Sequence, residues 1–500
     1  MAETVKAATG VPGLDDILAG GLIKGHVFLL EGTPGTGKTT IALRFLLEGS
    51  KAGEKCLYIT LSETEAELRA GAASHGWVID DNISVFELVP PDTVLDPSHQ
   101  QSLLYSSDLE LGETTQSIVE VIQRLKPSRV VLDSLSEIRL LAQSSLKYRR
   151  QLLALKHFFS RHSATVLLLD DRTSEVTDKT AHSIVHGVIQ LEELAPAYGA
   201  ERRRVRILKY RGTRYRGGFH DLTIRTGGVN VFPRLRATEH RTEFNRTTRS
   251  SGITELDALL GGGVEQGSST VVIGPAGTGK SLLTLQFIAA AIERGEKAAM
   301  FIFDEELGLL FERTRSFGFD LESLYNKGVL HVEQTDAAEV SPGEFAHRVR
   351  YIVDQFHATT VGIDSLNGYQ SAMPDESFLV LHVHELLQYL NRQGMNTFLT
   401  VAQHGLVGDM NSPVDVTYLA DTVILLRYFE ASGHVRRAIS VIKKRTGRHE
   451  ETIREYRITD GGIMIGPPLD QFNGVLTGVP RFMGEGSPLM RQDQGSASNS

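Results

Sequence analysis

Two short segments of the chain have residue types and spacing that could hold the phosphates of a nucleotide. Residues 32–39 and 274–281 both match the pattern G-x-x-x-x-G-K-[S/T]. In this pattern glycine N–H groups surround phosphate oxygens, the lysine reaches the β- and γ-phosphates, and the final hydroxyl binds Mg²⁺. A chance glycine-rich turn could produce one match, but each match here follows an apolar run and precedes a helical pattern. The sequence therefore predicts two sites for ATP and Mg²⁺.

The residues expected to bind nucleotide lie in these loops, at the start of the following helices, and at one later strand end in each half. The loop and helix residues are Gly32, Thr33, Gly35, Thr36, Gly37, Lys38, Thr39, Thr40, Gly274, Gly277, Thr278, Gly279, Lys280, Ser281 and Leu282. The hydroxyls of Thr39 and Ser281 are the expected metal ligands. Asp133 and Asp364 each end a later apolar run, where a carboxylate would complete the outer shell of the metal. The alternative is an ordinary aspartate at a strand end.

Acidic residues at the tip of another strand are candidates for the general base. Many ATPases with this loop place a glutamate directly after the strand-end aspartate, but that position is serine in both halves. The strand after each phosphate-loop helix ends instead in Glu63 and in Asp304-Glu305. A carboxylate there is typical of RecA-class ATPases and could orient water against the γ-phosphate. The alternative is a solvated acidic turn.

Each half also carries basic residues late in its sequence, Lys209 and Arg211 in the first and Lys443 and Arg445 in the second. A cation from a neighbouring subunit could stabilise charge at the γ-phosphate, whereas an exposed basic strand end is the alternative. The wider basic run at 202–216 could suggest a nucleic-acid surface, but it lacks the aromatic residues that would stack on bases.

These features repeat along the chain. An offset of 242 residues relates Lys38 to Lys280 and Glu63 to Glu305. Later features shift slightly from this offset, so the halves are duplicated lobes with loop insertions and deletions. The apolar runs lack clean alternation, as in parallel strands covered on both faces. We therefore expect an α/β fold of two tandem domains, each a mainly parallel β-sheet flanked by helices.

Composition suggests the domain boundaries. We predict a first domain at 1–238, a linker at 239–250, a second domain at 251–468 and a flexible tail at 469–500. The linker is rich in Arg, Thr and Glu, and the chain ends in Gly, Ser, Asn and Gln, a composition typical of disorder.

Bulk properties exclude several classes of protein. A net charge of −9 and a pI of about 6.0 disfavour a generic nucleic-acid binder. No apolar run approaches the roughly 18 residues that span a bilayer, and the first residues do not read as a signal peptide. The single cysteine, Cys56, excludes an intramolecular disulfide and sits in an apolar run, as a core residue would. We expect a cytoplasmic protein with neither a membrane nor a nucleic-acid partner.

The phosphate loops, strand-tip carboxylates and Lys-x-Arg pairs together resemble the KaiC family of circadian-clock ATPases and autokinases, over nearly all of residues 5–465. The resemblance implies tandem RecA-like P-loop domains in a homohexamer with ATP at the subunit interfaces. It implies ATP hydrolysis in the first domain and serine/threonine autophosphorylation in the second. Glu63 would activate water, and Glu305, with Asp304 as second candidate, would be the base toward a hydroxyl. Residues matching the family's trans-acting fingers are Lys209, Arg211, Lys443 and Arg445.

The chain departs from the family pattern in three places. The first strand tip has Ser62-Glu63 where the family has two glutamates. The family's phosphoacceptor pair is Ser-Thr, and this chain has Thr417-Tyr418. Thr417 can accept phosphate by the same chemistry, whereas Tyr418 is bulkier. The alternative is that both residues only pack against the lead into the next strand. Residues 472–478 do not preserve the tail pattern that docks the activator KaiA, which argues against dependence on KaiA. A KaiB-like protein is the other partner that the resemblance implies.

We therefore expect an ATPase and autokinase that acts in clock-type, stress or signalling regulation. One alternative is a RecA-type DNA-dependent ATPase, which the acidic net charge disfavours. Another is an ATP-gated oligomeric scaffold, in which the nucleotide state sets ring assembly. The presence of Glu63 and Glu305 argues for turnover.

Overall fold

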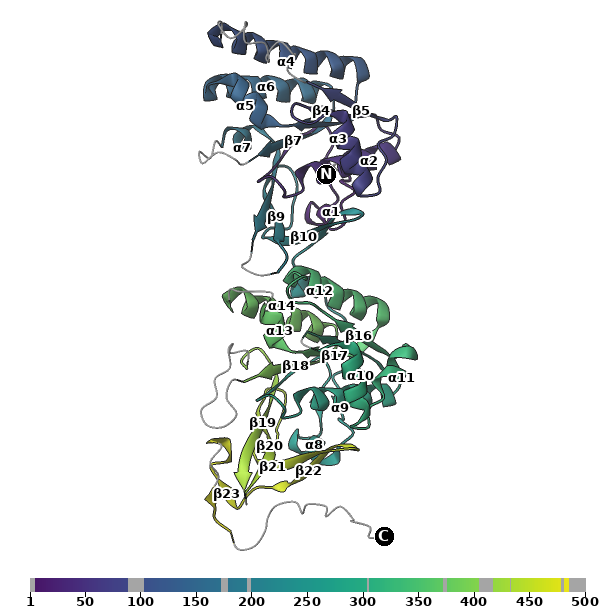
Figure 1. The fold of residues 1–500 in the computed structure, drawn as a ribbon, viewed down its shortest axis with the longest axis vertical. Helices are drawn as coiled ribbons and strands as arrows, with labels where there is room; N and C mark the ends of the chain where they lie inside the picture. Colours follow the sequence, from purple (N-terminus) through teal and green to yellow (C-terminus); the bar gives the residue numbers. More distant parts are fainter. Residues whose placement is uncertain are drawn as a thin grey trace. The chain divides into compact units, whose positions relative to one another are not determined.

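The computed structural model describes most of the chain, and contacts divide the chain into two units. The described residues are 5–88, 103–171, 179–195, 199–303, 305–371, 376–403, 417–431, 433–477 and 481–484, with the backbone alone described at 103–110, 371 and 376–378. The first unit is Met1–Arg234 and the second is Leu235–Ser500 (Figure 1).

The first unit is built on a nine-stranded sheet in the order β11-β10-β9-β8-β3-β7-β6-β4-β5. The strands from β8 to β5 in this order are parallel, and β9 to β11 form an antiparallel extension. The strands of this unit are β1 (Lys6–Ala7), β2 (Leu22–Ile23), β3 (Val27–Gly32), β4 (Cys56–Thr60), β5 (Ile83–Glu87), β6 (Arg129–Asp133), β7 (Thr165–Asp171), β8 (Gly187–Leu194), β9 (Arg202–Tyr210), β10 (His220–Arg225) and β11 (Gly228–Phe232). Its helices are α1 (Leu14–Ile17), α2 (Lys38–Lys51), α3 (Glu65–Ser74), α4 (Leu103–Leu125), α5 (Leu135–Ala142), α6 (Ser145–Arg161) and α7 (Thr180–Ile184).

The second unit has an equivalent sheet in the order β16-β15-β17-β18-β14-β19-β20-β21-β22, again parallel except for the last three strands. Its strands are β12 (Thr248–Arg249), β13 (Val264–Glu265), β14 (Ser269–Gly274), β15 (Lys297–Ile302), β16 (Leu330–Gln334), β17 (Ala358–Asp364), β18 (Asn396–Ala402), β19 (Thr422–Ala431), β20 (His434–Lys444), β21 (Arg454–Thr459), β22 (Gly462–Pro468), β23 (Phe472–Asn473) and β24 (Arg481–Phe482). Its helices are α8 (Thr254–Leu259), α9 (Lys280–Glu293), α10 (Leu307–Arg315), α11 (Leu321–Asn326), α12 (Pro342–Tyr351), α13 (Leu366–Ser371) and α14 (Glu376–Arg392), with short turns η3 (Ala237–Glu239), η4 (Ile352–Phe356) and η5 (Val475–Thr477).

Helices cover both faces of each sheet. In the first unit α1 to α3 pack on one face and α4 to α7 on the other, and in the second unit α8 to α11 and α12 to α14 do the same. Both faces of the parallel strands are therefore buried, which is why their sequences show no alternation. The predicted fold class, two tandem RecA-like domains with mainly parallel sheets flanked by helices, is confirmed.

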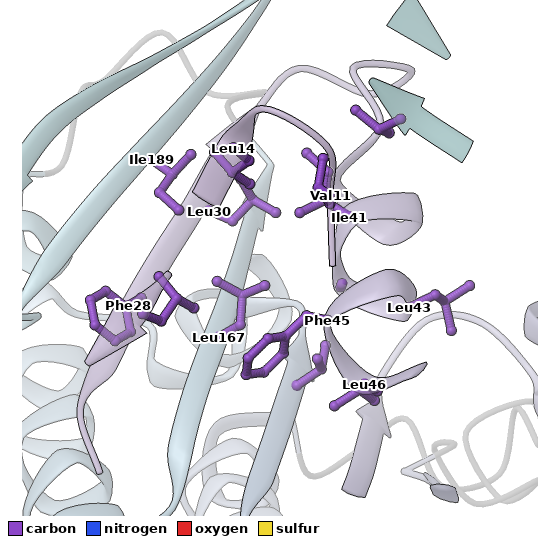
Figure 2. Close-up of a cluster of buried hydrophobic side chains, with 14 of the residues drawn as sticks. Val11, Leu14, Phe28, Leu30, Ile41, Leu43, Phe45, Leu46, Leu167 and Ile189 are labelled. Atoms are coloured by element: carbon purple, nitrogen blue, oxygen red, sulfur yellow. The ribbon is translucent and has the colours of Figure 1, made fainter. Parts of the chain in front are cut away.

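Successive residues of β3 supply two different cores. Phe28 and Leu30 pack with α2, as Figure 2 shows, whereas Val27 and Leu29 face the core formed with α4 to α6. Cys56 joins the first of these cores, as expected, and burial raises the pKa of its thiol to about 12. Strand β3, which precedes the phosphate loop, therefore packs against helices on both of its faces.

The segments between and after the two predicted domains also contact the second unit. Phe244 lies over Gly267 and Gly394, and β12 pairs with β13. Leu469 and Val475 are buried in a small cluster with Phe429. Phe244, Leu469 and Val475 therefore pack on the second unit. In the described ranges, no helix combines the length and the apolar character that a membrane span requires.

We predict that Leu167→Ala lowers the free energy of unfolding of the first unit by about 2–5 kcal/mol, because it removes buried methyl groups and leaves a cavity. Leu167 is 1% exposed. Urea unfolding followed by the fluorescence of Trp77, which packs against the same core, would measure the change. Leu140→Ala is the control, since Leu140 is 70% exposed and its loss should change stability by less than about 0.5 kcal/mol. Equal losses in the two variants would contradict the assignment of this core.

Candidate functional site

Each phosphate loop joins a central strand to a helix through a glycine that no other residue could replace without strain. Gly37, before α2, has φ 95°, and Gly279, before α9, has φ 94°. A Cβ at Gly37 would lie 2.7 Å from Ile224 Cδ1, and one at Gly279 would lie 2.8 Å from Ile458 Cδ1. Both loops therefore require glycine, and each directs a helix N-terminus toward the position that a phosphate would occupy.

The lysine of the first loop is buried and fully engaged. Lys38 is 8% exposed, and its Nζ donates to the carbonyls of Gly32 and Thr33, both at 3.0 Å. It also forms an ion pair of 2.7 Å with Asp171 Oδ1, at the end of β7. These three partners satisfy the ammonium group, so a bound triphosphate would have to take their place.

Thr39 and Asp133 form an oxygen pair beside this lysine. Asp133 ends β6 and accepts hydrogen bonds from the Tyr58 hydroxyl, at 2.6 Å, and from Thr39. Burial raises the pKa of Asp133, and these two hydrogen bonds oppose that shift. Hydroxyl and carboxylate oxygens suit Mg²⁺, which keeps several waters and takes other ligands from phosphate. No cluster of three or more acidic, histidine or cysteine side chains shaped for a metal occurs within the described ranges.

Local hydrogen bonds position Glu63 between β4 and α3. The Thr60 hydroxyl accepts from Glu63 N at 2.9 Å and donates to Glu63 O at 2.8 Å. Thr64 and Glu67 then form a capping box that begins α3. Partial removal from water, followed by the charges of Asp133, Glu67 and Asp171, raises the pKa of Glu63. The strand-tip carboxylate therefore lies within electrostatic reach of the other acidic groups of this site.

The second unit builds the same site from partly different residues. Lys280 donates to Pro275 O at 2.8 Å, and burial lowers its pKa while the charge of Asp364 opposes that shift. Asp364 accepts a hydrogen bond from Thr400, whereas Asp133 uses Tyr58. Ser281, like Thr39 in the first unit, is the second residue of its helix. Asp304 lies outside the described residues.

Glu305 is held in an ion pair. Arg313, on α10, donates from Nε to Glu305 Oε1 at 2.8 Å and from Nη2 to Glu305 Oε2 at 2.7 Å. This hydrogen bonding raises the pKa of Arg313, to which the charge of Asp364 also contributes. The next carboxylate, Glu306, caps α10 by accepting from Leu309 N at 2.9 Å. The two adjacent glutamates therefore have separate local partners.

The basic pairs lie away from the phosphate loops of their own units. Lys209 pairs with Val188 near the start of β8, whereas the phosphate loop follows the end of the neighbouring strand β3. Lys209 Nζ donates to the carbonyls of His182 and Val185, and Arg211 Nη2 donates to Ser183 O at 3.4 Å. Each cation thus holds the turn that leads into β8.

The same arrangement in the second unit contains the predicted phosphoacceptors. Lys443 Nζ donates to Thr417 O at 2.8 Å and to Ala420 O at 2.9 Å, and Arg445 donates to Tyr418 O. Thr417 and Tyr418 therefore take the places of His182 and Ser183 in the first unit. Tyr418 is 51% exposed, so about half of its surface is open to solvent.

Sequence reasoning missed four side chains of these sites. Tyr58 and Thr400 lie within strands and gave no signal beyond their strand pattern. Asp171 ends a strand, and Arg313 lies eight residues after Glu305. A comparison of the repeats would have marked Asp171 and Arg313 as charged residues, because the matching positions, Ala402 and Gly71, carry no charge.

A comparison with known families decides the assignment. The profile of the KaiC ATPase family matches residues 7–236 and again residues 249–470. The chain belongs to the KaiC family. The two matches begin 242 residues apart, at 7 and 249, the same offset that relates the two phosphate loops.

Curated relatives align along almost the whole chain. The circadian clock oscillator protein KaiC of Thermostichus vulcanus is 30% identical over 485 residues, which are 96% of this chain and 92% of the relative. The circadian clock protein KaiC3 of Synechocystis sp. is 29% identical over 482 residues, 95% of each chain. KaiC of Prochlorococcus marinus is 29% identical over 492 residues, 96% of each chain. The resemblance seen in the sequence is confirmed, and at this identity the chain is a divergent member of the KaiC family.

We predict that Asp171→Asn strengthens ATP·Mg binding at the first KaiC unit. The change removes the ion pair that Lys38 must exchange for phosphate, and it removes a negative charge near the expected γ-phosphate position. The dissociation constant should fall roughly three- to tenfold, or about 0.7–1.4 kcal/mol. Calorimetric titration in a Lys280→Ala background would isolate this site, with Ala402→Asn in a Lys38→Ala background as the matched control. Weaker binding in Asp171→Asn would show instead that Asp171 helps to hold the metal.

Proposed function

We propose that both units bind ATP·Mg, that the first unit hydrolyses it, and that the second transfers its γ-phosphoryl group to a hydroxyl of another copy of the chain. The observation that carries this proposal is the grouping of Lys38, Thr39, Asp133 and Glu63 at one edge of the sheet. Membership of an ATPase family gives independent support. Mg²⁺, when bound, would neutralise charge on the phosphates.

In the first unit we assign water activation to Glu63. Its raised pKa makes the carboxylate a stronger base, closer to the value that suits proton transfer near neutral pH. The water oxygen would bond to the γ-phosphorus as Glu63 accepts its proton, and the bond to the bridging oxygen would break to release ADP. Lys38 would move from its loop carbonyls and Asp171 to the phosphates.

In the second unit we assign the acceptor role to Thr417, and the geometry favours transfer between copies. The turn that contains Thr417 lies beside Ser269, the first residue of β14, because Asp421 N donates to Ser269 O at 2.9 Å. The phosphate loop follows Gly274, at the other end of the same strand. At about 3.3 Å per residue these ends are roughly 17 Å apart, which is too far for attack on the nucleotide of the same unit.

A closed ring of identical chains would supply the missing proximity. Head-to-tail interfaces between identical chains form a ring when the rotation closes. Each interface would then bring Thr417, Lys443 and Arg445 of one copy to the phosphate loop of the next. Lys209 and Arg211 would do the same in the first unit. We propose the homohexamer of the KaiC pattern for this assembly, with a KaiB-like protein as partner.

The biological role that we propose is clock-type, stress or signalling regulation. The relatives are named as circadian clock proteins, which supports a clock-type role. The chain has no net positive charge, so we place DNA-dependent motor activity second. Stimulation of turnover by single-stranded DNA would reverse that order.

We predict that Glu63→Gln, in a Lys280→Ala background, lowers ATP turnover by about 10²–10⁴-fold while ATP still binds. The carboxamide keeps the shape of the side chain but cannot accept the proton. Released phosphate and calorimetric titration would measure the two quantities, and Ser62→Ala is the control at the neighbouring position. Turnover of the parent should fall as the pH is lowered through a pKa above that of an ordinary glutamate. Unchanged turnover in Glu63→Gln would exclude this residue as the base.

We predict that incubation with ATP·Mg phosphorylates Thr417, and that Glu305→Gln abolishes this modification without preventing ATP binding. Mass spectrometry of the peptide spanning residues 410–425 would locate the phosphate, with Tyr418→Phe as the control that should keep it. In a mixture of Lys280→Ala and Thr417→Ala chains, only the former has an acceptor and only the latter can donate. Phosphate on the Lys280→Ala chain is the expected result, and its absence from the mixture would contradict transfer between copies.

A further inference from the structure

The two strand-tip glutamates differ in their immediate surroundings. Arg313 contacts both carboxylate oxygens of Glu305, at 2.7 and 2.8 Å. Glu63 receives no such cation, and no hydrogen bond or ion pair to its carboxylate occurs among the residues that the structure describes. A bidentate guanidinium–carboxylate pair is among the strongest charge-assisted contacts in proteins. One glutamate is therefore neutralised and oriented, and the other is available.

Equivalent helix positions produce this difference. Thr64 and Glu306 cap α3 and α10, so Glu63 and Glu305 each precede the cap by one residue. The residue seven positions after the cap is Gly71 in the first unit and Arg313 in the second. That position lies two turns along the helix, from where a long side chain can reach back to the carboxylate. The two units thus share the backbone of this segment, and the contact in the second unit depends on one residue difference, arginine in place of glycine.

We propose that Arg313 is a positioning residue that restrains the second unit by holding Glu305 in a resting ion pair. While both oxygens accept from the guanidinium, Glu305 cannot take a proton from an attacking hydroxyl or water. The inference rests on the base roles proposed for the two strand-tip glutamates. Arg313 also lies within electrostatic reach of Asp364, so it faces the side of the site where phosphate would bind. A triphosphate would therefore compete with Glu305 for the guanidinium, and nucleotide binding would release the base.

A first experiment removes the ion pair between Arg313 and Glu305, which we call the clamp. In a Lys38→Ala background, where only the second unit binds ATP, Arg313→Gln should raise ATP turnover at least threefold at an ATP concentration below saturation, at which the resting ion pair still forms. The same change in a Glu305→Gln background should have no effect, because the clamp acts through Glu305; a purely structural role for Arg313 would change both backgrounds. Arg315→Gln is the control on the same helix, since Arg315 pairs with Glu322. That variant should leave turnover unchanged.

Installing the clamp tests the other half. A Cβ at Gly71 would meet no atom within 4 Å, so Gly71→Arg can be accommodated on α3. In a Lys280→Ala background this variant should lower first-unit turnover at least threefold at an ATP concentration below saturation, whereas Gly71→Ala should not. Rescue of Gly71→Arg by high ATP concentration would agree with competition by phosphate.

The outcomes separate this inference from the proposed function. Turnover that depends on Glu305 or Glu63, but does not respond to Arg313→Gln or Gly71→Arg, would overturn the clamp alone. A lower turnover in Arg313→Gln would overturn it too, because Arg313 would then assist the reaction. Turnover that is independent of both glutamates in every background would overturn the proposed base roles, and the clamp with them.

Discussion

A lysine ammonium withdrawn from water needs partners that neutralise it, and much of the arrangement of the first site follows from that requirement. In the first unit, Lys38 has two loop carbonyls and the carboxylate of Asp171. Asp171 in turn raises the pKa values of Asp133 and Glu63, because like charges at short range disfavour ionisation of one another. The interaction that compensates the cation is thus also one of those that make the strand-tip glutamate a better base. A bound triphosphate would take over the neutralising role and change this balance.

The two units show how one backbone framework supports different charge distributions. The sheet order, the glycines before the helices and the helix caps correspond between the repeats. Some side chains around the phosphate loops do not correspond, since Asp171 aligns with Ala402 and Gly71 with Arg313. Differences in chemistry between the units are therefore expected to arise from a few side chains and not from the fold.

The sequence was sufficient for the fold class because its signals are local or repeated. The loop pattern, the buried runs without alternation and the offset of 242 residues each constrain the topology, and together they predict two mainly parallel sheets. The partners of the site residues were harder to predict, because they lie far away in the sequence. Tyr58 reaches Asp133 across 75 positions, and only the strand order β7-β6-β4 brings Asp171, Asp133 and Glu63 together. Pairing across a sheet is a tertiary property that no short window contains.

The link between the basic pairs and the turns has a consequence for an assembly of identical chains. Lys443 donates two of its three N–H groups to the carbonyls of Thr417 and Ala420. The positions of the Lys443 cation and of the candidate acceptor hydroxyl of Thr417 are therefore linked. If Lys443 approached the γ-phosphate of a neighbouring copy, Thr417 would be carried toward the same group. The first unit keeps the cation and the turn, but it has His182 in place of the threonine, and that side chain bonds the buried Glu31 at 2.7 Å. A shared interface would therefore deliver a cation in both units and the threonine only in the second, which matches the hydrolysis proposed for the first unit and the transfer to a hydroxyl proposed for the second.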